Sequence, residues 1–493
     1  MNSRTMTKPL VAAVALVFIL NARADVRLPT LFSDNMVLQQ NQRAPVWGWA
    51  DEGEEVKVSF RGKTAKAKAK DGKWMVNMGR LSAGGPDVLA IEGKNRLELK
   101  NVLVGEVWVC SGQSNMEWPL KASFESTNDI AASVNPKLRL FLVTKAKADT
   151  AQQDVRGQWK ECNPETVPGF SAVAYYFGRD LQKSRNVPVG LIGTYWGGSP
   201  AEVWMSQRTL ESNPDYKQDI LVAYTEAVRK ADASGNKKQQ PGWRPTELYN
   251  GMIAPLVPYG IKGAIWYQGE SNAGRAQQYR SLFADMIQNW RHDWGQGNFT
   301  FLAVQLAPWD KGKKRTLEAI TEKPGDSDWA ELREAQLLAT KTLPNVGMAV
   351  ITDVGDKDDI HPTKKEPVGA RLALAARGVA YGEKIECSGP IYKKMLVKDG
   401  QVILSFEHID GGLEARGGEL TGFAVCGPER KFVWAKAEIR GDTVVVSSPQ
   451  VSQPVAVRYG WSDFPVVNLW NKVGLPATPF RTDDFPMVTA KKK

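Results

Sequence analysis

Histidine and cysteine are scarce in this sequence, with three histidines and four cysteines among 493 residues. No His-Glu-x-x-His segment and no Cys-x-x-Cys pair occurs. Because zinc sites are built from such closely spaced ligands, the sequence argues against metal-dependent chemistry, and we expect neither a metal nor another cofactor. One or two disulfides are possible in an exported protein. The sequence does not decide their pairing, although we favour Cys387 with Cys426.

Long hydrophobic runs are absent beyond the N-terminus, so no membrane span is expected. The apolar run at residues 10–20 is too short to be one. It follows Arg4 and Lys8 and precedes an Ala-x-Ala site at residues 22–24, an order typical of a secretory signal peptide. We therefore expect residues 1–24 to be a signal peptide and the protein to be exported, either periplasmic or secreted.

A concentration of charge of one sign is also missing. The formal net charge is +10, but acidic and basic residues intermix, and no basic stripe or arginine-rich helix occurs. A nucleic-acid partner is therefore not expected. The length is about right for two or three domains. No pattern indicates an oligomeric state.

Hydrophobic periodicity divides the mature chain into three parts. Residues 25–100 alternate polar and apolar side chains between Gly and Asp-Gly turns, which predicts an N-terminal β domain. In residues 101–383 strand patterns alternate with helix patterns, as in a mainly parallel sheet. Short strand patterns return in residues 384–493 and predict a C-terminal β domain. Whether the two β parts pack together cannot be read from the sequence.

The central part carries the clearest element predictions, and the fold class they indicate is α/β. The predicted strands are residues 102–110, 187–195, 263–267, 300–304 and 347–352. The predicted helices are residues 172–183, 276–290, 331–342 and 367–381.

Three polar loops with glycine follow predicted strands of this part. They are Gly112-Gln113-Ser114-Asn115, Gly197-Gly198-Ser199-Pro200 and Gln268-Gly269-Glu270-Ser271-Asn272. In open α/β sheets ligands bind beyond the carboxyl ends of the strands, so we expect these loops to converge on one crevice. Ser114 stands where α/β hydrolytic enzymes place a nucleophile, beside a small residue that lets a carbonyl approach the backbone.

A serine nucleophile needs a base, which is usually histidine because its pKa lies near working pH. His292 ends a predicted helix, and His408 lies in the remote C-terminal part. His361 follows two adjacent acids in a loop, and this context favours it over the usual reading of a loop histidine as a solvated residue. Asp358 and Asp359 are both close enough along the chain to orient the ring, and the sequence does not decide which of them does so.

The oxyanion that forms in acyl transfer needs hydrogen-bond donors. The predicted donors are the Ser114 backbone N–H, an N–H of Gly197 or Gly198, and a side-chain amide of Gln268 or Asn272. The predicted substrate-binding residues are Asn115, Trp196 and Glu270. The alternative role of Asn115 is to brace its loop.

Two other chemistries compete with this interpretation. Ser271 nearly matches the Gly-x-Ser-x-Gly elbow but has alanine at the last position, so it ranks below Ser114. Paired carboxylates for glycoside hydrolysis would have Glu270 as their best candidate. That reading leaves Ser114 and His361 unexplained.

Several blocks together resemble the sialate O-acetylesterase family, a branch of the SGNH-type esterases. The similar blocks at the predicted site are residues 112–116, 196–204, 266–272 and 359–362, and those outside it are residues 31–39, 170–175 and 458–461. The resemblance implies a flavodoxin-like three-layer α/β/α core with β-rich accessory portions. It implies Ser114 as nucleophile and His361 as base. The Asp-Ile-His-Pro pattern of the family favours Asp359, whereas the wider SGNH spacing favours Asp358.

Three functions are therefore considered. The favoured one is an exported serine esterase that removes O-acetyl groups from sialic acids through an acetyl-Ser114 intermediate. The second is an esterase for acetylxylan or another acetylated polysaccharide, for which the same residues would serve. The third is a noncatalytic glycan-binding protein, which would need neither Ser114 nor His361. In each case the expected partner is a sugar or glycan.

Overall fold

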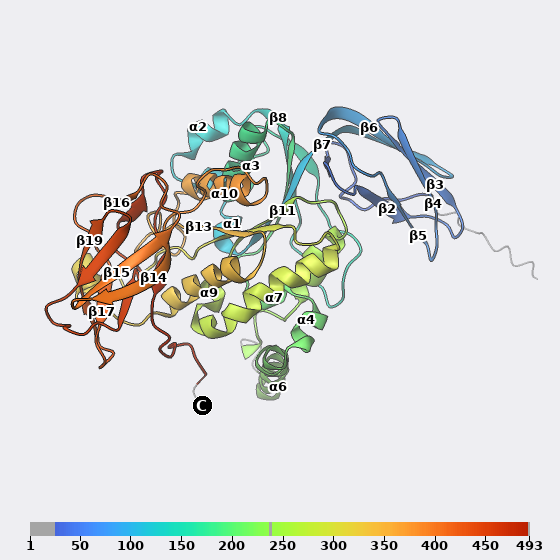
Figure 1. The fold of residues 1–493 in the computed structure, drawn as a ribbon. Coiled ribbons are helices and arrows are strands. Elements are labelled where there is room, and N and C mark those ends of the chain that lie inside the picture. Colours follow the sequence, from blue (N-terminus) through green and yellow to red (C-terminus); the bar gives the residue numbers. More distant parts are fainter. Residues whose placement is uncertain (1–24, 236–238, 492–493) are drawn as a thin grey trace, which may run out of the picture.

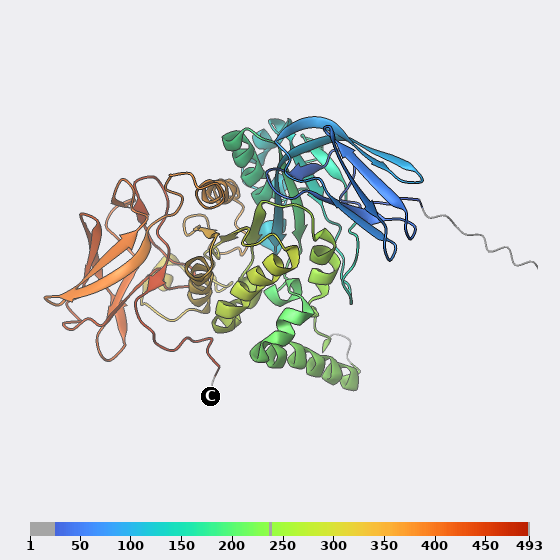
Figure 2. The same ribbon diagram turned by 45° about the vertical axis from the view of Figure 1, so that its right-hand side comes forward.

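The structure is a computed structural model that describes residues 25–235 and 239–491. The predicted signal peptide, residues 1–24, lies outside the described residues. An α/β body forms the middle of the molecule, and the N-terminal and C-terminal β portions lie on opposite sides of it (Figures 1 and 2). The two β portions are thus separated by the α/β body.

A mainly parallel sheet forms the centre of this body. Its strand order is β13-β12-β11-β7-β10-β8-β9, and every pair is parallel except β8 with β9. Without the edge pair β8 and β9, the strands run in the flavodoxin-like order 2-1-3-4-5 along the chain. Their bounds are β7 Arg96–Gly112, β8 Asn135–Leu142, β9 Trp159–Cys162, β10 Val189–Tyr195, β11 Gly263–Tyr267, β12 Thr300–Val304 and β13 Val346–Ala349.

The central strands are apolar along their length because helices cover both faces of the sheet. Every residue of β10, β11, β12 and β13 is buried. The strands predicted at residues 263–267 and 300–304 are confirmed residue for residue, and the other three overlap β7, β10 and β13. Strand β8 and the edge strand β9 were not predicted.

Helices of 14 to 19 residues form the outer layers (Figure 1). Phe177 of one helix packs edge-on against Trp108 of β7, and Trp290 of another packs edge-on against Trp266 of β11. Trp108 and Trp266 point to opposite faces of the sheet, so the predicted three-layer α/β/α fold is confirmed. One layer contains α3 Ala172–Arg185 and α10 Glu366–Val379, and the other contains α7 Ala276–Trp294 and α9 Asp328–Thr342. Further helices are α1 Ser114–Glu117, α2 Ser126–Ala131, α4 Gln207–Ser212, α5 Pro214–Tyr216, α6 Ala223–Ser234 and α8 Leu317–Thr321.

The N-terminal β portion joins the body through strand β7. Residues 96–105 of this strand pair with β6 and β1, whereas the residues from Glu106 onward pair with β10 and β11. The predicted border between residues 100 and 101 therefore falls inside one continuous strand, and the domain division stays a prediction. The other strands are β1 Val37–Gln39, β2 Pro45–Trp49, β3 Glu55–Phe60, β4 Lys63–Lys68, β5 Lys73–Asn77 and β6 Gly84–Glu92.

The C-terminal β portion has its own hydrophobic core. Two four-stranded sheets, β14-β15-β20-β19 and β18-β17-β21-β23, contribute side chains such as Val402, Phe423, Val446 and Val457 to this core. Strands β16 and β22 form a further pair. The bounds are β14 Ile391–Lys398, β15 Gln401–Glu407, β16 Leu413–Ala415, β17 Phe423–Cys426, β18 Phe432–Trp434, β19 Lys436–Arg440, β20 Thr443–Ser447, β21 Ala456–Tyr459, β22 Leu469–Asn471 and β23 Phe480–Arg481.

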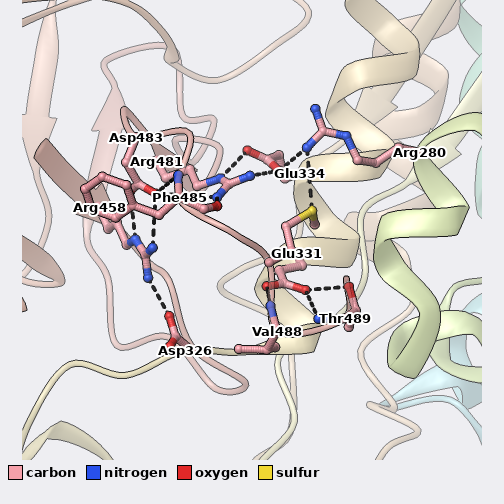
Figure 3. A network of polar contacts seen from close by, with 11 residues as sticks. Arg280, Asp326, Glu331, Glu334, Arg458, Arg481, Asp483, Phe485, Val488 and Thr489 are labelled. Carbon is pink, nitrogen blue, oxygen red and sulfur yellow. Dashed lines mark hydrogen bonds and ion pairs between the residues drawn. The ribbon is translucent and has the colours of Figure 1, made fainter. Parts of the chain in front are cut away.

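Ion pairs hold the C-terminal β portion against the body (Figure 3). Arg481 of β23 binds Glu334 of α9 at 2.8 Å. Arg458 of β21 binds Asp326, two residues before α9, at 2.8 Å, and the Arg458 side chain is buried. Because separating such pairs would leave buried charges unpaired, they fix the β portion on helix α9.

All four cysteines lie in the described part of the chain and all four are free thiols. The favoured Cys387–Cys426 disulfide is therefore wrong. Cys426 is buried in β17 between two neighbouring strands, whereas Cys387 lies beside Gly378 of α10. Among the described residues, no helix has both the length and the apolar composition needed to cross a membrane.

Candidate active site

The three predicted loops meet at the carboxyl ends of β10, β7 and β11, where the strand order reverses. The Gln113 side-chain oxygen accepts a hydrogen bond from the Ser271 backbone N–H at 3.3 Å. The Ser271 hydroxyl in turn donates to the Gly198 carbonyl at 3.0 Å. These contacts join one residue from each loop, so the loops form one site.

Gly112 makes the turn at the end of β7. Its φ is 138°, a conformation that residues with a side chain rarely adopt. A Cβ atom there would also collide with the Tyr267 carbonyl oxygen of the neighbouring strand. The following residues therefore turn abruptly into α1, whose first residue is Ser114.

Ser114 and His361 face each other across the site. The Nε2 atom of His361 lies 2.9 Å from the Ser114 hydroxyl oxygen, within hydrogen-bond distance. The imidazole stacks on Trp118, with 5.6 Å between ring centroids and 20° between ring planes. This stacking fixes the orientation of the ring toward Ser114.

The two candidate acids differ in their contacts. An Asp359 carboxylate oxygen lies 3.6 Å from His361 Nδ1 and also accepts the His361 backbone N–H at 2.8 Å. Asp358 instead binds Lys357 at 2.6 Å. Burial lowers the pKa of His361 from its usual 6.5; the Asp359 carboxylate opposes this shift, and the ammonium of Lys365 adds to it.

The predicted oxyanion donors fall into two groups. The Gly197 N–H donates to the Glu117 carboxylate at 2.7 Å. The side-chain amide of Gln268 is buried and donates to protein oxygens, one of which is Asn272 Oδ1 at 2.6 Å. The Asn272 amide in turn donates to the buried Glu202 carboxylate at 2.9 Å. By contrast, the backbone N–H groups of Ser114 and Gly198 have no acceptor within residues 25–235 and 239–491.

Asn115 and Glu270 are hydrogen-bonded to each other next to Ser114. Asn115 is fully buried and its amide donates to a Glu270 carboxylate oxygen at 2.6 Å. The other Glu270 oxygen is buried without a hydrogen-bond partner in the part of the chain described. Burial raises the pKa of Glu270, and the hydrogen bond from Asn115 opposes that rise. Asn115 therefore connects the turn of Ser114 to the loop of Glu270, and the substrate-binding roles of both residues stay predictions.

Trp196 forms part of the rim. It is half-buried, and the ammonium groups of Lys145 and Lys147 lie 5.2 Å and 5.8 Å from its ring centroid. Lys145 also binds Glu117 at 2.5 Å. The rim next to Ser114 thus combines an aromatic face with two cations.

Comparison with known proteins agrees with this geometry. Residues 104–377 match the family described as carbohydrate esterase, sialic acid-specific acetylesterase. The chain belongs to this family. Sialate O-acetylesterases from Pongo abelii and Mus musculus are 30% and 28% identical to it, over 92% and 89% of this chain and 92% and 90% of those proteins. A carbohydrate acetylesterase from Xanthomonas citri has a solved structure that matches with a TM-score of 0.83 at 42% identity, covering 94% of this chain and 100% of that one.

The matched segment of this carbohydrate esterase contains all three loops and the loop of His361. The other histidines lie elsewhere: His292 contacts Arg208, and His408 binds Glu386. Ser271 is exposed, and its hydroxyl contacts a backbone carbonyl. Within the described residues, no three His, Cys, Asp or Glu side chains gather in a way that could hold a metal ion.

Two residues of this carbohydrate esterase site were missed from the sequence. Glu117 fills the position beside the Gly197 N–H, and Lys365 lies buried behind Asn115 with 1% of its surface exposed. The sequence contains a Lys364-Lys365 pair, and no local signal distinguishes the buried lysine from the exposed one.

Proposed function

We propose that this carbohydrate esterase is an exported sialate O-acetylesterase with Ser114 as nucleophile, His361 as general base and Asp359 as the acid that orients His361. The 2.9 Å contact between His361 Nε2 and the Ser114 hydroxyl supports these roles most strongly. Sialic acid as the substrate rests on the family and on the named activity of the mammalian relatives. Export rests on the signal-peptide pattern of residues 1–24.

The reaction has two acyl-transfer steps. The Ser114 hydroxyl oxygen attacks the acetyl carbonyl carbon while His361 Nε2 takes its proton. The resulting imidazolium then gives that proton to the sugar oxygen as the ester C–O bond breaks, which leaves acetyl-Ser114. Water attacks this ester with His361 again as base, and collapse of the second tetrahedral intermediate releases acetate and restores Ser114.

The oxyanion of each tetrahedral intermediate needs donors that are free in the unliganded site. The Ser114 and Gly198 backbone N–H groups meet this requirement. The Gly197 N–H becomes a third donor only when the Glu117 carboxylate moves away. Gln268 and Asn272, whose amides are bound inside the protein, support the loops in this proposal.

The rim of the site suits an acidic sugar. Sialic acid carries a carboxylate, and Lys145 places an ammonium group above the Trp196 ring beside the nucleophile turn. A carboxylate that replaces Glu117 as the partner of Lys145 would lie next to the Gly197 N–H as well. Substrate binding would then release a third oxyanion donor.

Acetate release from O-acetylated sialic acid and from acetylated xylan tests the proposal. We expect faster release from the sialic acid and none above background from Ser114→Ala on either substrate. Faster release from xylan would favour the polysaccharide esterase, a reading consistent with the broader name of the Xanthomonas citri neighbour. Sugar binding without acetate release from the wild type would favour a glycan-binding protein.

A further inference from the structure

Lys365 is a buried ammonium group that the acyl-transfer steps do not use. It precedes helix α10, and 1% of its surface is exposed. Its Nζ atom donates to the Asn115 side-chain oxygen at 2.6 Å. Burying a charge is costly unless it is paired and hydrogen-bonded, so its neighbours show what it stabilises.

Asn115 passes this contact on to two other segments. Its side-chain nitrogen donates to Glu270 at 2.6 Å and to the Ile360 carbonyl oxygen at 3.0 Å. Asn115 follows Ser114 directly, and Ile360 precedes His361 directly. One carboxamide, held by Lys365, therefore ties the nucleophile turn to the histidine loop.

The charges around Lys365 favour its ionised form only in part. The carboxyl groups of Glu270 and Asp359 attract it, and the rings of Trp118 and Tyr267 lie 5.7 Å and 5.4 Å from its Nζ. Burial outweighs these attractions and lowers its pKa to about 7. Below that pH the ammonium is present and disfavours protonation of the nearby histidine.

We propose that Lys365 is a positioning residue of this site, which holds the Asn115 carboxamide against Ile360 and acts on His361 through its positive charge, since the Lys365 ammonium and the His361 imidazole both lie against the Trp118 ring. The first effect sets the distance between the nucleophile and its base. The second keeps His361 able to accept a proton in mildly acidic solution. The inference rests on the proposed roles of Ser114 and His361, but its electrostatic part concerns the histidine alone.

NMR titration of the imidazole signals tests the electrostatic part without any substrate, and the chain has only three histidines to assign. We expect Lys365→Met to raise the pKa of His361, because the ammonium that disfavours the imidazolium is removed. Lys365→Gln should raise the pKa of His361 similarly. This variant keeps a donor for Asn115 and is the one to use should the methionine variant not fold. The matched control is Lys364→Met, because Lys364 is exposed and lies over Phe124. In this control variant the pKa of His361 should equal that of the wild type. An unchanged or lowered His361 pKa in both Lys365 variants would overturn the electrostatic role.

Acetate-release kinetics test the positioning part. We expect Lys365→Met to lower kcat/KM by about 10- to 100-fold, because a misplacement of about 1 Å can have such an effect, and to move the acid limb of its pH profile upward. Lys365→Gln should move the limb equally with a smaller loss of rate. A loss of rate with no movement of the limb would reduce Lys365 to a structural residue. Activity retained by Ser114→Ala would instead overturn the proposed function and leave the NMR result standing.

Discussion

His361 Nε2 lies 2.9 Å from the Ser114 hydroxyl oxygen, although 247 positions separate the two residues along the chain. Ser114 follows β7 at the centre of the sheet, whereas His361 is in the loop after β13, three strands away at the edge. Stacking on Trp118 and the hydrogen bond from Asn115 to the Ile360 carbonyl hold this loop over the site. In the proposed mechanism, proton transfer therefore depends on how the loop after the edge strand is anchored.

Replacement of the two adjacent acids should separate their roles. Asp359→Asn should lower kcat/KM by about 10- to 100-fold, less than for a buried catalytic aspartate, because this carboxylate is 60% exposed and 3.6 Å from Nδ1. Asp358→Asn, which removes a partner of Lys357, should leave kcat/KM unchanged. The opposite ranking in acetate-release assays would assign the orienting role to Asp358.

The pH profile should show a base that stays neutral in mildly acidic solution. His361 accepts a proton only when it is neutral, and burial lowers its pKa from 6.5. As pH falls, kcat/KM should decline only below pH 6.5. Because the Asp359 carboxylate raises this pKa, Asp359→Asn should move the limb to still lower pH. A limb above pH 6.5 in the wild type would contradict the lowered pKa of His361.

Gly112→Ala should disable the nucleophile turn. The new methyl group would meet the Tyr267 carbonyl oxygen, and a positive φ is unfavourable for alanine, so the unfolding free energy should fall by at least about 1–3 kcal/mol. Displacement of Ser114 should lower kcat about 100-fold. The control is Gly295→Ala, also at a positive φ but in open space at the end of α7. The Gly295→Ala variant should lose about 1 kcal/mol of unfolding free energy, measured by denaturant unfolding, and keep its kcat. Equal losses of kcat in the two variants would contradict a specific role for Gly112.

Lys145→Met should change substrate preference. Loss of an ammonium partner for the sialic acid carboxylate should raise KM for O-acetylated sialic acid about tenfold, which corresponds to about 1.4 kcal/mol. The KM for a neutral acetylated sugar should stay the same, because that sugar has no carboxylate to bind. Equal changes on both substrates would show that Lys145 acts through its contact with Glu117 instead.

Local sequence patterns predicted much of the central fold, and long-range contacts explain what they missed. β11 and β12 are short apolar runs between turns, so their bounds were predicted residue for residue. The pattern of β8 was not recognised because three of its eight residues are exposed, two of them near its start, which interrupts the apolar run. The continuous β7 hid the join between two portions, since a strand pattern does not tell which neighbours it pairs with.

The site, too, was predicted where local patterns carry the information and missed where long-range contacts do. Ser114 could be proposed because its loop follows a buried strand, and His361 because the chain has few histidines. The occupation of the Gly197 N–H by Glu117 and the burial of Lys365 depend on contacts between loops that periodicity does not reveal. The proposed cysteine pair failed for the same reason: Cys387 packs against Gly378 of α10, whereas Cys426 lies in β17 between β18 and β21, and both thiols are free.

Acetate release by Ser114→Ala is the most direct test of the nucleophile. With O-acetylated sialic acid as substrate, the variant should lose at least about 1,000-fold in kcat relative to the wild type, with an unchanged circular dichroism spectrum. Mass spectrometry of the wild type quenched during turnover should find an acetyl group on the peptide that contains Ser114. Wild-type rates in Ser114→Ala, or an acetyl group on Ser271 instead, would contradict the assignment of Ser114.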